Sequence, residues 1–114
     1  MNIFENIERS SLENSMNIAL FDDKLLMSYQ QLYGCLVNNQ AILKAQGYCS
    51  GDKVIIMVEN QFDFVIAFLS FLSIECWVIP IPRDITIIEL QRIIDFTGAK
   101  GYDKKILKLV VEYK

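Results

Sequence analysis

The sequence predicts an α/β fold in which helices are layered on a mostly parallel sheet, with a small hairpin at the N-terminal end. Residues 54–58 form a continuous apolar run, as in a parallel strand that is covered on both faces, and residues 77–79 form a second, short apolar run that predicts a strand. Residues 60–74 lie between these runs with helical character, and a strand–helix–strand order predicts a right-handed βαβ unit. Hydrophobic residues make up 53% of the chain and charged residues 22%, which indicates a packed domain rather than a disordered one.

A short helix and a hairpin are predicted ahead of the first strand. Apolar residues recur through 1–16, as far as Leu12 and Met16, at the spacing of a helix that caps the domain. Residues 17–21 and 24–27 are short apolar runs that flank a pair of aspartates. This arrangement is typical of a small antiparallel hairpin closed by a tight polar turn.

Polar residues and glycines mark where the other helices begin and end. A side-chain acceptor at a helix start satisfies free backbone N–H groups, and glycine commonly follows the last turn. The boundary residues are Ser28 with Gln31 and Gly47, Asn60 with Asp63, and Thr86 with Glu89 and Gly98. In the last of these helices, Leu90, Ile93 and Ile94 are predicted to face inward. Residues 99–102 make a poor strand, and 106–111 form a closing element whose type the sequence leaves open.

The helix predicted over 60–74 is apolar on almost every side. Only Asp63 and Ser70 give it a narrow polar stripe, so another surface must cover its outer side. A lone chain of this length also has too few elements to cover both faces of its sheet. We therefore expect this helix to contact either the remainder of a larger protein or a homodimer partner, with Phe68 and Phe71 as contacts.

Charge and hydropathy exclude other classes of partner. The net charge is -3 and the basic residues are scattered, so we expect no nucleic-acid binding. Residues 64–81 are almost long enough to span a bilayer, but Glu75 and Pro80 interrupt them, so we expect no membrane contact. A membrane-associated hairpin is the alternative. No secretory signal is visible at the start of the sequence, which favours a cytoplasmic location.

The sequence assigns no catalytic, cofactor-binding or metal-binding residue. The chain has no His, and its 5 glycines are too dispersed to form a phosphate-binding loop or a dinucleotide fingerprint. The three cysteines share no Cys-x-x-Cys spacing and are expected to be buried thiols of a reducing compartment. They are Cys35, Cys49 and Cys76.

Four further side chains invite a functional interpretation. Glu59 and Asp84 follow the two strands and could lie at the carboxyl edge of the sheet, where open α/β folds bind ligands. Loop acids are more often solvated, and we favour that interpretation. Glu75 is expected to be a solvent-exposed charge at a helix end, with a buried ion pair as the alternative. Trp77 is expected to lie in the core rather than to form a ligand platform.

Several segments resemble, in order and spacing, a superfamily of adenylate-forming enzymes that contains acyl-CoA synthetases, luciferases and peptide-synthetase adenylation domains. The resemblance is strongest over 17–100, and its segments are 26–32, 47–54, 59–64, 72–81 and 86–100. The chain departs from the family at Ile74-Glu75, where the family commonly has Ala-Gly. It also departs at 101–103, where polar residues replace an expected strand.

The resemblance implies that 1–114 is a single N-terminal subdomain of an adenylate-forming ligase, with a partial flavodoxin-like fold. Such enzymes use ATP and Mg to form an acyl-adenylate from a carboxylate, and usually pass the acyl group to coenzyme A or a carrier protein. Their phosphate loop, acyl pocket, ribose-binding acid and C-terminal lysine lie beyond the matched region. We therefore expect a non-catalytic scaffold without a cofactor of its own. The alternative is a stand-alone flavodoxin-like protein-interaction module.

Overall fold

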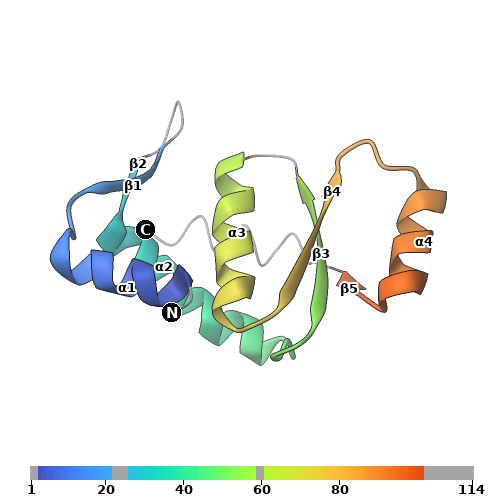
Figure 1. Ribbon diagram of the computed structural model, residues 1–114, viewed down its shortest axis with the longest axis horizontal. Coiled ribbons are helices and arrows are strands. Elements are labelled where there is room, and N and C mark those ends of the chain that lie inside the picture. Colours follow the sequence, from blue (N-terminus) through green and yellow to red (C-terminus); the bar gives the residue numbers. More distant parts are fainter. Residues whose placement is uncertain (1–2, 22–25, 59–60, 102–114) are drawn as a thin grey trace.

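The structure is a computed structural model that describes residues 3–21, 26–58 and 61–101 (Figure 1). Its elements follow the order predicted from the sequence. They are α1 Ile3–Glu13, β1 Ile18–Phe21, β2 Leu26–Ser28, α2 Tyr29–Ala45, β3 Lys53–Val58, α3 Gln61–Ser73, β4 Trp77–Pro82, α4 Ile87–Thr97 and β5 Lys100–Gly101. Strands β1 and β2 form an antiparallel pair, and the other three form a parallel sheet in the order β4-β3-β5. The predicted α/β fold, with its small hairpin, is confirmed.

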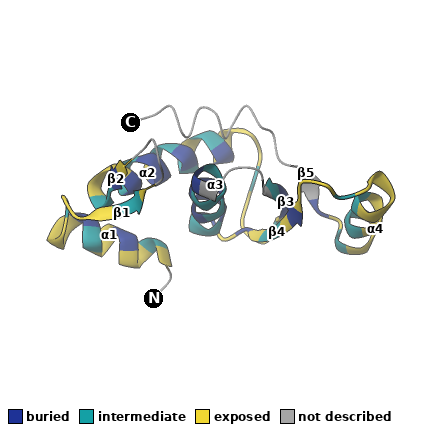
Figure 2. Ribbon diagram, turned by 90° about the horizontal axis from the view of Figure 1, so that it is seen from above, coloured by how far each residue is buried: buried dark blue, intermediate teal, exposed yellow. Residues whose placement is uncertain are grey.

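The elements form a row of layers (Figures 1 and 2). Helix α3 covers one face of the parallel sheet and α4 covers the other, so both faces are covered. The expectation of an uncovered sheet face was therefore wrong. Helix α2 packs on α3, and α1 packs on α2. Within the described ranges, no helix combines the length and the apolar character needed to cross a bilayer.

The hairpin and the first helix are only partly covered. Met27 is buried opposite Leu20, whereas the next cross-strand pair, Phe21 and Leu26, is exposed. The predicted turn between the two runs lies outside the described residues. Helix α1 packs through Phe4 and Ile7, but Leu12 and Met16 are exposed, so these two residues do not contribute to the cap as expected.

The predicted capping residues begin α2 and α4. The Ser28 hydroxyl accepts a hydrogen bond from the Gln31 N–H (3.2 Å), and the Gln31 side chain accepts one from the Ser28 N–H (2.9 Å). The Thr86 hydroxyl accepts one from the Glu89 N–H (3.1 Å). The glycines predicted to end these helices both take the left-handed conformation that a Cβ disfavours: Gly47 with φ 96° and Gly98 with φ 68°. The predicted cap Asn60 lies outside the described residues.

Strand β4 extends beyond the predicted 77–79 and includes Pro80 and Pro82. In the described part of the chain β4 pairs only with β3, and an edge strand tolerates proline because one of its sides needs no N–H donor. Strand β5 pairs with β3 over two residues, so a short strand does form in the segment predicted to be a poor one. The closing element predicted over 106–111 lies outside the described residues.

Helix α3 is buried as predicted, but Ser70 of its polar stripe does not face solvent. Ser70 is buried, accepts a hydrogen bond from the Asn39 side-chain amide of α2 (3.0 Å) and donates one to the Ile66 carbonyl (2.7 Å). The Asn39 side-chain oxygen is buried and has no hydrogen-bond partner among the residues that the structure describes. The outer side of α3 is therefore covered by α2 of the same chain.

The expected partner contacts on α3 are also revised. Phe71 lies in the core, with its ring edge against Tyr48 at a centroid distance of 5.0 Å, so the expectation that it contacts a partner was wrong. Phe68 is half-buried and packs on Phe64. In the second core, between the sheet and α4, the predicted inward residues Leu90, Ile93 and Ile94 pack against the buried residues as expected.

Candidate functional site

The carboxyl edge of the sheet, where the sequence placed two acids, carries no assembled site in the described residues. Strands β3 and β4 run in register and end together, because Val58 pairs with Pro82. Asp84 follows β4 and is exposed, in agreement with the interpretation of a solvated loop acid. Glu59 lies outside the described residues, so the structure does not test whether the two acids meet.

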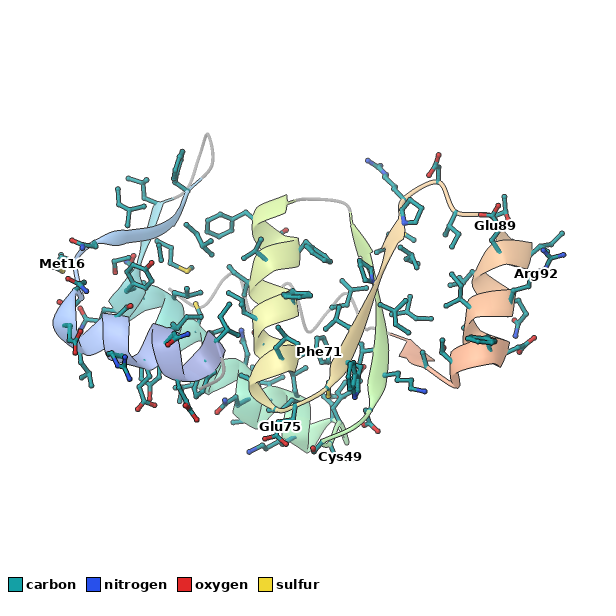
Figure 3. The ribbon with its side chains drawn as sticks, in the orientation of Figure 1. Met16, Cys49, Phe71, Glu75, Glu89 and Arg92 are labelled. Atoms are coloured by element: carbon teal, nitrogen blue, oxygen red, sulfur yellow. The ribbon has the colours of Figure 1, made fainter. Side chains whose placement is uncertain are left out.

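A surface pocket lies at the opposite edge, where β3 and β4 begin. Its volume is ≈ 390 Å³, and it lies where α2 and α3 end. Figure 3 places Cys49 and Glu75 next to each other at this end of the molecule, below Phe71. The lining residues are Lys44, Tyr48, Cys49, Ser50, Ser73, Ile74 and Glu75.

The turn that leads into β3 is closed by its own polar groups. The Asp52 N–H donates to the Cys49 carbonyl (3.1 Å), and one Asp52 carboxylate oxygen accepts from the Cys49 N–H (2.9 Å). The same oxygen accepts from the Cys49 thiol (3.5 Å). Gly51 supplies the left-handed backbone that the turn needs, with φ 89°. The polar segment 50–52 thus forms the turn and holds Cys49 at its start.

This turn is tied to the segment that leads into β4. The Gly51 N–H donates to the Glu75 carbonyl (2.9 Å), and the Trp77 N–H donates to the Asp52 carbonyl (2.7 Å). The Ser50 hydroxyl donates to the Glu75 carboxylate (3.0 Å). The two segments are therefore held side by side by both backbone and side-chain hydrogen bonds.

Glu75 is exposed and takes the left-handed conformation, with φ 65°. The interpretation of an exposed charge at a helix end is confirmed over that of a buried ion pair. Among the residues that the structure describes, it is the only one other than glycine with a positive φ. A side chain at this φ is disfavoured, because its Cβ crowds the following carbonyl oxygen. Glu75 is thus a strained residue at the rim of the pocket.

Two other expectations at this edge were wrong. All three cysteines are thiols, but only Cys35 and Cys76 are buried, whereas Cys49 is exposed. Cys49 lies in a turn between the end of α2 and β3, where none of the described helices or strands covers it. Trp77 is 68% exposed rather than buried, because it opens an edge strand. The sequence shows the polar residues after Cys49, and these could have indicated its exposure.

The described residues do not assemble an evident reaction centre. They include no group of three or more potential metal ligands among His, Cys, Asp and Glu. Away from the pocket, burial raises the pKa of Tyr33. The Tyr33 hydroxyl donates a hydrogen bond to the Glu8 carboxylate (3.1 Å), and this bond and the carboxylate charge raise the pKa of Tyr33 further. This pair links α1 to α2, so its role is in packing the first layers.

Comparison with known families identifies the group to which this arrangement belongs. The family model described as AMP-binding enzyme matches residues 7–102. The chain belongs to the AMP-binding enzyme family. The match begins within α1, before the region 17–100 in which the sequence resemblance is strongest. The AMP-binding assignment confirms the predicted superfamily. A comparison with curated protein sequences finds no match.

Solved structures share the fold of this AMP-binding chain. The N-terminal subdomain of NpsA from Klebsiella oxytoca has a TM-score of 0.83 and 16% identity, covering 98% of this chain and 33% of that chain. A fatty acid AMP ligase from Legionella pneumophila has a TM-score of 0.74 and 22% identity, covering 93% of this chain and 20% of that chain. The chain therefore matches the fold of one part of larger adenylation enzymes. This match does not favour the alternative of a stand-alone interaction module.

Sequence reasoning missed two features of this family member. The first is the contact between Asn39 and Ser70, because residues far apart in sequence give no pairing signal. The second is the strain at Glu75. The departure from the family's Ala-Gly pair could have revealed it, since a glycine at that position indicates a backbone that a side chain disfavours.

Proposed function

We propose that the chain is the non-catalytic N-terminal scaffold of an ATP-dependent ligase that activates carboxylates as acyl-adenylates. The family match over residues 7–102 carries this proposal. The chain spans 33% of the N-terminal subdomain of NpsA and 20% of the fatty acid AMP ligase, which supports a role as one part of a larger catalytic body. Adenylation of a carboxylate in the cytoplasm, with ATP and Mg bound by the rest of the enzyme, follows from this proposal.

The partner of this scaffold is the remainder of the ligase. Its docking surface includes the outer side of α4, because Ile87, Ile88 and Phe96 are 85%, 67% and 92% exposed. Figure 2 shows this helix as largely exposed on the side that faces away from the sheet. Large apolar side chains that stay exposed on a folded chain are typical of surfaces that another body covers. This assignment replaces the helix over 60–74 as the contact surface.

Calorimetric titration of the chain with MgATP tests the scaffold role. We expect no heat of binding and no carboxylate-dependent pyrophosphate exchange, since the basic residues are scattered in the sequence and its glycines form no phosphate-binding loop for a triphosphate. A micromolar affinity that disappears when the chain is denatured would contradict the proposal.

Sedimentation and dye binding test the docking surface. We expect the wild-type chain to bind a hydrophobic dye, and Phe96→Asp to reduce that binding without unfolding the chain. Phe21→Asp is the matched control, because Phe21 is 73% exposed on the hairpin at the other end of the molecule. A concentration-dependent dimer that Phe96→Asp dissociates would identify a second copy as the partner. Equal effects of the two substitutions would argue against a specific surface on α4.

A further inference from the structure

Two thiols lie on the two hydrogen-bonded segments at the pocket edge. The Cys76 thiol donates to the Cys49 carbonyl at an Sγ–O distance of 3.4 Å. Because a carbonyl oxygen lies about 2.4 Å from its own α-carbon, this contact places the Cys76 sulfur within about 6 Å of the Cys49 α-carbon. A disulfide joins sulfurs about 2.05 Å apart and usually holds the two α-carbons about 4.4 to 6.8 Å apart, so a bridge needs the Cys49 side chain to turn toward the nearby Cys76 sulfur and the two segments to approach each other.

We propose that Cys49 and Cys76 form a redox pair, which peroxide converts to an intramolecular disulfide across the starts of β3 and β4. The turn 49–52 and the segment 75–77 are already held together by the hydrogen bonds of Gly51, Ser50 and Trp77, so little chain entropy remains to be lost. The main movement is a rotation of the Cys49 side chain. Its sulfur must leave the Asp52 carboxylate and turn toward Cys76.

The reaction has two steps, with hydrogen peroxide as the oxidant. The exposed Cys49 sulfur attacks one peroxide oxygen, which breaks the O–O bond, forms a sulfenic acid and releases one water. The Cys76 sulfur then attacks the Cys49 sulfur, which forms the S–S bond, breaks the S–O bond and releases a second water. Two thiols are oxidised by two electrons, and the peroxide is reduced to two waters.

The exposure of the cysteines gives the pair its order of reaction. Cys49 is exposed and meets the oxidant first, whereas Cys76 is buried beside it and resolves the sulfenic acid. Cys35 is buried on α2, in the core on the α3 side of the sheet, and serves as an internal control. The bridge would link the residues that precede β3 to those that precede β4, and so close the loop that contains β3 and α3. In a reducing cytoplasm such a bond is reversible, as in redox-sensing proteins.

Peptide mapping of the full chain after treatment with hydrogen peroxide tests the proposal. We expect the intact mass to fall by about 2 Da, the mass of two thiol hydrogens, and a peptide pair joined through Cys49 and Cys76. The bridge should form at least about tenfold faster in the folded chain than in urea, because folding holds the two thiols close. Cys35→Ala should form the same bridge at the same rate.

Cys49→Ser is the negative control, because it removes one of the two sulfurs at an exposed turn position. It should abolish the bridge and keep the wild-type circular dichroism spectrum. Any of four outcomes would overturn the proposal: a bridge that includes Cys35, a dimer linked through Cys49, a stable sulfinic acid at Cys49 beside an unreacted Cys76, or equal rates in the folded and the unfolded chain.

Discussion

Replacement of Glu75 by glycine tests the strain at the pocket rim. Its φ of 65° costs a residue with a Cβ about 1 to 2 kcal/mol relative to the right-handed form. Glycine removes that cost, but it also lowers the free energy of unfolding by about 0.5 to 1 kcal/mol, because the unfolded chain has more conformational freedom at a glycine. Glu75→Ala keeps the strain and, like the glycine variant, loses the hydrogen bond from Ser50. The comparison of the two variants therefore isolates the backbone.

We expect Glu75→Gly to be more stable than Glu75→Ala by about 0.5 to 1 kcal/mol, or a few degrees in Tm for a chain of this size. Urea unfolding followed by circular dichroism measures the difference. At an ordinary helical position the order reverses, since glycine is there about 1 kcal/mol less favourable than alanine. A glycine variant less stable than the alanine variant would refute the left-handed conformation. Ser50→Ala, which removes only the hydroxyl donor, should change stability by less than about 0.5 kcal/mol.

Three further predictions concern the layers behind the pocket. Ser70→Ala should lower the free energy of unfolding in urea by about 1 to 3 kcal/mol, because it leaves the buried Asn39 amide without its acceptor. The double variant Asn39→Leu with Ser70→Ala should recover most of that loss, since neither polar group then remains. Phe71→Ala should destabilise the chain by about 3 to 5 kcal/mol in the same assay, since Phe71 is fully buried; a loss below about 1 kcal/mol would contradict its place in the core. Glu8→Gln should lower the pKa of Tyr33 toward its ordinary value in an NMR titration of the tyrosine rings, because the pKa of Tyr33 is raised in part by the Glu8 charge.

The pH dependence of this last pair has a definite sign. The folded state raises the pKa of Tyr33, so the folded chain holds the phenolic proton more tightly than the unfolded chain does. The stability that this provides is fully present below the unfolded pKa of about 10, and is lost as the pH rises through the folded value. Glu8→Gln should therefore weaken the loss of stability above about pH 10. If the free energy of unfolding falls above about pH 10 as steeply in Glu8→Gln as in the wild-type chain, the contact between Tyr33 and Glu8 is contradicted.

The local elements of this fold were readable because their signals are local. Ser28 and Thr86 cap helices whose first turns lie within reach of their own hydroxyls, and Gly98 ends a helix through its own backbone freedom. The apolar run at 54–58 forms the central strand of the parallel sheet. A continuous apolar run is typical of a strand that is covered on both faces, so its position could be predicted from the sequence. The family resemblance then added the assignment to adenylate-forming enzymes, which the match over 7–102 confirms.

Burial was harder to predict than element type, because it depends on which elements meet. Trp77 and Cys49 resemble core residues in the sequence, yet an edge strand and a turn leave both exposed. Ser70 resembles a surface residue, yet α2 covers it and supplies Asn39 as a partner. Phe71 was expected to contact a partner because its helix is apolar on almost every side, yet the packing of α3 within the chain places it in the core.

The sequence alone determined the order of the elements, the helix caps, the parallel core of the sheet and the family. These features depend on residues that are close together in the chain, or on motifs that can be recognised directly in the sequence. Only the tertiary structure decided which faces stay open and which polar groups meet. Contacts such as that between Cys49 and Cys76 join segments separated by a whole helix, and their geometry exists only once β3, α3 and β4 have packed.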